Sequence, residues 1–182
     1  MIEDNVLMEQ TKNGDKSAYE TLVIKHRAAA INFAYSIIFD LYEAEDIVQE
    51  CFVKVYLNRM TYNPSHTFKT YLFTVIHNSC IDYLRKNKKS RSVSLDDITK
   101  ISNNVAPEDS LIKTERMAAI FKNLDGLPND YKTALYLYAV DEMNYNEIAK
   151  LMKKSIPQVK ITIHRARTKL KKLCERDDIF EK

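Results

Sequence analysis

Residues 144–173 read NYNEIAKLMKKSIPQVKITIHRARTKLKKL, and this pattern predicts a helix-turn-helix. Asn144 is suited to cap a short first helix, and Ser155 is suited to cap a longer second one. Between residues 150 and 173 there are nine Lys or Arg and no Asp or Glu. Solvated helix faces usually mix both signs, so the pattern favours a helix that binds duplex DNA over a merely solvated one.

The second helix of this motif has two distinct faces. An apolar stripe is expected to pack on the rest of the domain, and it consists of Val159, Ile163, Ala166, Leu170 and Leu173. The opposite side carries the hydrogen-bonding and cationic groups that a helix in the major groove presents to bases and phosphates. The residues expected to contact DNA are Gln158, Lys160, Ile161, Thr162, His164, Arg165, Arg167 and Lys172.

The rest of the chain predicts an all-α protein, because 182 residues contain only 2 glycines and 4 prolines and show long helical periodicity. The further helices are expected at 4–12, 16–38, 42–58, 67–86, 111–124 and 129–140. Periodicity is lost where Ser, Asn, Asp and Lys dominate, which predicts a flexible linker between two small helical domains. The expected division is an N-terminal domain over 1–90, a linker over 91–110 and a C-terminal domain over 111–177.

Charge and motif content restrict the function class. Although the net charge is +3, residues 65–91 form a second basic block, so two polyanion contacts are expected. Three widely spaced cysteines, an acidic N-terminus and no apolar run of membrane-spanning length predict a soluble cytoplasmic protein. No catalytic spacing, phosphate-binding glycine loop or metal-ligand set is found. The sequence therefore predicts no enzyme, no catalytic residues, no cofactor, no metal and no small-molecule substrate.

Two helices of the N-terminal domain carry unusual polar faces. On the helix over 42–58, Asp46, Gln49 and Glu50 form a compact polar face. Most acidic helix faces are only solvated, but this one would suit a protein partner with basic residues. The helix after Pro64 combines aromatic and basic side chains, which is typical of sites that hold single-stranded DNA. The residues expected there are Tyr62, Tyr71, Phe73, Asn78, Arg85 and Lys86. Phe68 is expected in the core, whereas Phe73 falls on the opposite side of the helix.

Several short sequence motifs occur along the chain in the same order as in bacterial RNA polymerase sigma factors of the extracytoplasmic-function (ECF) group, within the sigma-70 superfamily. The chain therefore resembles a member of this group. The resemblance covers nearly the whole chain. It rests on GDKSAY at 14–19, AEDIVQECF at 44–52, FKTYLF at 68–73, LP at 127–128, YNEIA at 145–149, VK at 159–160 and HRAR at 164–167.

The resemblance implies a division of labour between the two domains. Asp46, Gln49 and Glu50 match the motif that docks on the polymerase largest subunit. The loop over 59–67 and the following helix match the part that melts the minus-10 element, and the recognition helix matches the minus-35 reader. The implied partners are core RNA polymerase, promoter DNA and a cognate anti-sigma factor.

The chain departs from the family pattern in three places. Tyr71 stands where the family usually has Trp, Ile161-Thr162 replace the usual Ser-Arg, and the turn of the helix-turn-helix lacks its glycine. The alternative within DNA binding is a stand-alone helix-turn-helix regulator, which would dimerise on a palindrome and would need no acidic docking helix.

Overall fold

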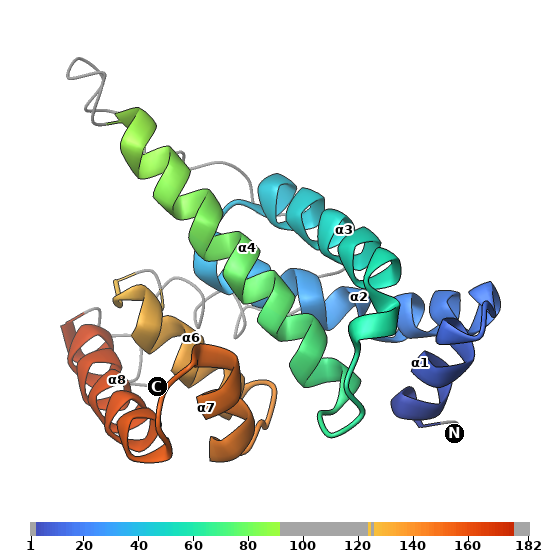
Figure 1. Cartoon of the computed structure of the whole chain (residues 1–182). Coiled ribbons are helices and arrows are strands. Elements are labelled where there is room, and N and C mark those ends of the chain that lie inside the picture. The colour runs from blue at the N-terminus through green and yellow to red at the C-terminus, as the bar shows by residue number, and fades with distance from the viewer. Residues whose placement is uncertain (1–2, 92–123, 125, 177–182) are drawn as a thin grey trace.

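The computed structural model describes residues 3–91, 124 and 126–176, and every regular element in this part of the chain is helical (Figure 1). The first half contains α1 (Asp4–Lys12), α2 (Lys16–Ile38), α3 (Leu41–Leu57), the short 3-10 helix η1 (Arg59–Thr61) and α4 (Phe68–Arg91). The second half contains α6 (Asn129–Ala139), α7 (Tyr145–Met152) and α8 (Ile156–Arg176). The predicted all-α class and the helix-turn-helix are confirmed. The expected linker and nearly all of the expected helix over 111–124 lie outside the described residues.

Capping residues fix where the helices begin. The Asp15 carboxylate accepts a hydrogen bond from the backbone N–H of Ser17 at 2.9 Å and so starts α2. The preceding Gly14 has a φ of 98°, a conformation that glycine adopts at little cost. At α7, Asn144 and Glu147 form a reciprocal capping box, with N–H···O distances of 3.1 and 3.0 Å.

The turn between α7 and α8 keeps its shape without a glycine. Lys153 follows the last residue of α7 with a φ of 53°, and the N–H of Lys154 bonds to the carbonyl of Ala149 at 2.9 Å. This closes α7 in the manner usual for a C-terminal glycine, at a backbone cost of about 1 kcal/mol. Ser155 then caps α8 by accepting a hydrogen bond from the N–H of Gln158 at 3.4 Å.

The first half encloses its core between α2, α3 and α4. The rings of Phe33 and Phe73 stack there with centroids 4.8 Å apart, and α1 is tied to α2 by a 2.8 Å contact between Asp4 and His26. In the second half, the apolar stripe of α8 is confirmed: Val159, Ile163 and Ala166 are buried, and Leu170 and Leu173 are half-buried. Among the described helices, none combines the length and the apolar character needed to cross a membrane.

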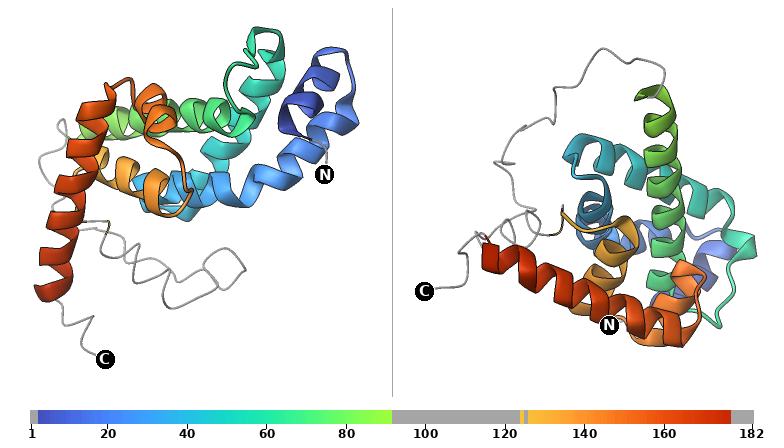
Figure 2. Two further views of the ribbon diagram at one scale, coloured as in Figure 1. Left: turned by 90° about the horizontal axis from the view of Figure 1, so that it is seen from below. Right: turned by 90° about the vertical axis from the view of Figure 1, so that its left-hand side faces the viewer.

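The two halves pack against each other along α2–α6 and α4–α7 (Figure 1). The ring of Phe33 lies 5.8 Å from that of Tyr136, which joins the aromatic core of the first half to α6. In the left view of Figure 2, α8 lies at the opposite end of the molecule from α1. The basic helix is therefore on the outside, whereas the start of α4 faces the second half.

Candidate binding surfaces

The polar face of α3 is exposed as the sequence predicts. Asp40 starts the helix by accepting a hydrogen bond from the N–H of Glu43 at 3.2 Å, and α3 buries its apolar side, which includes Ile47, Val48 and Cys51. Asp46, Gln49 and Glu50 lie on the solvent side. Beside them Val53 is 54% exposed, which is unusual for a valine on a helix that already buries an apolar face.

An open groove of about 800 Å³ runs between α2 and α3 beside this face. Its apolar floor includes Val23 and Phe52, and its wall includes Asp46 and Gln49. Sequence reasoning missed Glu45, which also lines the groove. Glu50 does not line the groove, and its carboxylate instead lies 3.4 Å from Nζ of Lys54. The groove is lined by charges of both signs, with Lys16 and Arg27 on α2 and the carboxylates of Glu45 and Asp46 on α3. Its α3 side therefore suits a helix with apolar and basic side chains.

Tyr62 lies in the interior, although the sequence analysis assigned it to single-stranded DNA. It is only 4% exposed, and its hydroxyl lies 2.6 Å from Oδ1 of Asn5 and 2.7 Å from the carbonyl of His66. Burial raises the pKa of this hydroxyl to about 12. Tyr62 therefore braces the loop before α4 against α1, and its ring is not available for stacking on a base in this arrangement.

The expectation that Phe73 lies outside the core is also wrong, because its side chain is fully buried. The assignment assumed that α4 buries one stripe. In the structure α4 packs on α2, α3 and α7, so a much wider sector of its surface is covered. Phe73 occupies this wider sector, stacked on Phe33 with Nζ of Lys69 at 5.4 Å from its ring centroid.

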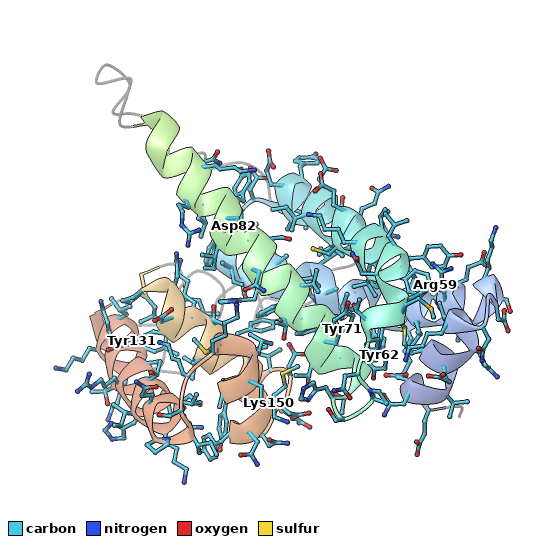
Figure 3. The ribbon with its side chains drawn as sticks, viewed as in Figure 1. Arg59, Tyr62, Tyr71, Asp82, Tyr131 and Lys150 are labelled. Carbon is cyan, nitrogen blue, oxygen red and sulfur yellow. The ribbon has the colours of Figure 1, made fainter. Side chains whose placement is uncertain are left out.

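The remaining residues assigned to single-stranded DNA are accessible. Tyr71 is half-buried at the start of α4, with its ring edge-on to Tyr62 at 5.3 Å (Figure 3). Asn78, Arg85 and Lys86 are exposed further along the helix. The Arg85 guanidinium lies 2.9 Å from the carboxylate of Asp82, and both side chains are mostly exposed. Tyr71 thus lies at the start of α4, whereas the exposed Arg85 and Lys86 lie more than three helical turns further along it.

On α8, most of the predicted DNA-facing residues are exposed. They are Gln158, Lys160, Ile161, His164, Arg165, Arg167 and Lys172. Ile161 is 51% exposed, as expected for a side chain that meets a partner. The exception is Thr162, which is 8% exposed and donates its hydroxyl hydrogen to the carbonyl of Gln158 at 2.8 Å. Thr162 lies next to the apolar stripe, and that position accounts for its burial.

Gln158 has a second role that the sequence analysis missed. Its side-chain oxygen accepts hydrogen bonds from the backbone N–H of Ser155 at 2.8 Å and from the Ser155 hydroxyl at 3.0 Å. Together with the Ser155 cap, this makes a reciprocal capping arrangement at the start of α8. The Ser-x-x-Gln spacing at 155–158 is the signal that could have revealed it.

Polar contacts join the start of α4 to the second half. Nζ of Lys69 lies 2.8 Å from Oδ1 of Asp141, and the Thr70 hydroxyl lies 3.3 Å from the carboxylate of Glu147. Nζ of Lys150, labelled in Figure 3, lies 3.3 Å from Nδ1 of His66. Burial raises the pKa of Asp141, and the ammonium of Lys69 offsets part of that rise. No local pattern predicts these contacts, because the partners are 72 or more residues apart.

Two family profiles match the chain. Residues 22–90 match "Sigma-70 region 2", and residues 119–170 match "Sigma-70, region 4". The ECF RNA polymerase sigma factor SigW of Bacillus subtilis is 30% identical over 174 residues, covering 91% of this chain and 93% of SigW. SigM of the same organism is 35% identical over 144 residues, covering 79% and 87%. The sigma-E factor of Escherichia coli K12 is 29% identical over 178 residues, covering 90% of each.

Solved structures share the fold. CnrH, in a complex with the cytosolic domain of CnrY, superposes with a TM-score of 0.74 at 24% identity, covering 96% of this chain and 98% of CnrH. The sigma factor RpoE of Bartonella quintana, in a complex with the anti-sigma factor NepR, gives a TM-score of 0.72 at 23% identity. That match covers 86% of this chain and 96% of RpoE.

Proposed function

This chain belongs to the ECF group of sigma-70 factors, which direct core RNA polymerase to promoters, and from this premise we propose which residues carry each step. The observation that carries the proposal is the separation of two opposite surfaces. A groove with an apolar floor and an acidic wall on α3 lies on the first half, and an exposed basic helix face lies on the outside of the second. A stand-alone regulator is not favoured, because the similarity to ECF factors extends over both halves.

The groove between α2 and α3 is the proposed docking site for core polymerase. Asp46 and Gln49 supply polar contacts from its wall, and Val23 and Val53 supply apolar area. Glu50 lies just outside the groove and adds to the negative potential that steers a basic partner. This agrees with the role that the family motif implies for Asp46, Gln49 and Glu50.

The proposed single-strand surface is smaller than the sequence analysis assumed. It consists of Tyr71, which replaces the usual Trp as a stacking ring, and the exposed Asn78, Arg85 and Lys86 of α4. The proposed minus-35 surface consists of the exposed residues of α8, with Lys160 and Arg165 at its centre. Thr162 is not part of this surface, because its side chain is buried and its hydroxyl bonds to the carbonyl of Gln158 in the same helix.

Promoter binding also requires the two halves to move apart. The minus-35 and minus-10 elements are separated by roughly two turns of duplex, on the order of 70 Å at 3.4 Å per base pair. In this structure α4 and α7 are in contact, with Nζ of Lys69 only 2.8 Å from Asp141. The arrangement therefore represents a closed form, and engagement of both elements needs an open one. We propose the domain division at 1–90 and 111–177, which separates the helices on either side of this contact.

A protein inhibitor is the further proposed partner. Both structural relatives described above were solved in complexes, one with the cytosolic domain of CnrY and one with the anti-sigma factor NepR. We place the factor in the cytoplasm, where it meets polymerase and DNA, and assign it no catalytic step of its own.

Charge reversal in the groove tests the docking assignment. Asp46→Lys combined with Glu50→Lys is expected to weaken binding to core polymerase by about tenfold or more, since like charges across an interface cost several kcal/mol. Glu9→Lys on α1 is the matched control, because Glu9 is exposed and lies outside the groove. Fluorescence anisotropy of the labelled full-length chain, titrated with core enzyme, measures the affinity. Unchanged affinity in the double variant contradicts the assignment.

A further inference from the structure

Four side chains form a continuous stack where α6, α7 and α8 meet. Nζ of Lys160 lies 5.4 Å from the ring centroid of Tyr145, and the ring of Tyr145 stacks on that of Tyr138 with centroids 5.2 Å apart. The Arg167 guanidinium closes the stack at 4.8 Å from the Tyr138 ring. Two tyrosine rings are thus held between two cations of the basic helix.

Within the described residues, the two cations at the ends of the stack have no carboxylate partner. Other cations near this half are paired, such as Lys154 with Asp130 at 2.6 Å and Lys69 with Asp141. In the described part of the chain, neither Lys160 nor Arg167 lies within ion-pair distance of a carboxylate. Their orientation therefore comes from aromatic rings.

An aromatic ring and a carboxylate can both hold a cationic side chain in place, but they differ in how much of its positive charge stays available to a ligand. A carboxylate would hold a long cationic side chain in place, but it would also cancel the charge that attracts a phosphate. The face of a tyrosine ring attracts the cation through its quadrupole and leaves the full positive charge available. On a helix that binds a polyanion, aromatic rings can therefore hold the cations in place without reducing the net positive charge, as carboxylates would.

The geometry also places both cations on one side of α8. Lys160 and Arg167 are seven residues apart, close to two full turns, so they lie about 10 Å apart along the helix axis. Both are exposed, and both rings are half-buried.

We infer that Tyr138 and Tyr145 are positioning residues for DNA binding, which hold Arg167 and Lys160 extended toward the phosphates of the minus-35 duplex. This inference rests on the proposed function of α8. The tyrosines themselves need not touch DNA. Each acts through the cation that it supports, so its effect should disappear when that cation is removed.

A double-mutant cycle on the full-length chain tests this inference, with a labelled 30-base-pair duplex of mixed sequence as the probe. Tyr138→Leu is expected to weaken binding about threefold in the presence of Arg167, and by a negligible factor in an Arg167→Ala background. Tyr138→Phe keeps the ring and should bind like the parent protein. Tyr145→Leu should couple to Lys160→Ala in the same way. Lys169→Ala is the control, because Lys169 is exposed on α8, and its effect should add to that of Tyr138→Leu.

The outcomes separate this inference from the proposed function. If Arg167→Ala and Lys160→Ala leave duplex affinity and its salt dependence unchanged, the assignment of α8 fails and the inference fails with it. If both matter, but Tyr138→Leu weakens binding equally with and without Arg167, only the positioning role is overturned. Loss of binding in Tyr138→Phe equal to that in Tyr138→Leu also overturns it, and this variant stays informative if the leucine variant unfolds.

Discussion

Nζ of Lys69 on α4 lies 2.8 Å from Oδ1 of Asp141, and this ion pair joins the two halves of the protein. The Asp141 side chain is 7% exposed, so the contact is made in a largely dry environment. Lys69 also bonds to the backbone carbonyl of Asp141 at 3.2 Å. The pair holds the start of α4 against the loop that precedes α7, so crosslinking it fixes the two halves in the arrangement that we propose to be closed.

Locking this contact should block promoter opening. A variant with Lys69→Cys, Asp141→Cys and Cys174→Ser, joined by a cleavable bismaleimide, is expected to bind core polymerase but to form no open complex. The physical reason is that the tethered halves cannot span both promoter elements. Permanganate footprinting of melted thymines measures opening. Cleavage of the crosslink should restore it, and full opening with the crosslink intact would rule out the need for separation.

Replacing Tyr71 or Phe73, two of the aromatic residues at the start of α4, should have different consequences. Phe73→Ala is expected to lower the free energy of unfolding by about 3–5 kcal/mol, because the ring is fully buried and stacked on Phe33. Tyr71→Ala should affect stability less but slow promoter opening about tenfold or more, since stacking on a base is worth ~1–3 kcal/mol. Thermal unfolding and stopped-flow opening kinetics separate the two effects. Equal loss of stability in both variants would refute the distinction.

The turn of the helix-turn-helix offers a stabilising substitution. Lys153 adopts a φ of 53°, which is strained for any residue with a Cβ atom. Lys153→Gly is expected to raise the free energy of unfolding by up to about 1 kcal/mol. Lys153→Ala is the matched control, because it removes the same charge without relieving the backbone. Urea denaturation gives both values, and equal stability of the two variants would contradict the assignment.

Acidification should destabilise the folded protein through two histidines. Burial lowers the pKa of His26 and of His77 below the ordinary value of 6.5, so the folded state favours their neutral forms. Neighbouring carboxylates, Asp4 and Asp130, offset part of each shift. The resulting stability is fully present above pH 6.5 and is lost as pH falls through the lowered values.

The check is a comparison of melting temperatures at pH 7.5 and pH 5.5. The parent protein should melt at a lower temperature at the acid pH, and His77→Gln should reduce the difference. A difference that is unchanged in both His26→Gln and His77→Gln would assign the pH dependence to other groups.

Local sequence patterns predict the elements well, because caps and apolar stripes act over a few residues. Asn144 with Glu147 caps α7, and Val159 with Ile163 marks the buried side of α8, as the spacing indicates. These features depend only on helix geometry. The fold class and the helix-turn-helix could therefore be predicted from the chain alone.

Burial of a residue by a helix that is distant in the sequence could not be predicted from such local patterns. The sequence predicts DNA contacts for Phe73 and Tyr62 because their own helix or loop offers no reason for burial, yet α2 and α1 cover them. Thr162 turns inward through a bond to its own helix backbone. The contact of Lys69 with Asp141 spans 72 residues, and no periodicity encodes such a distance.

The central claim is that this chain gives core RNA polymerase its promoter specificity through both halves. The most direct test is transcription by core enzyme, with and without the full-length chain, from linear templates with a randomised upstream segment, followed by sequencing of the transcripts. The account predicts new starts only with the chain present, all preceded by one shared pair of elements at the minus-35 and minus-10 positions. Starts identical to those of core enzyme alone, or a single palindromic element bound by the chain without polymerase, would contradict it.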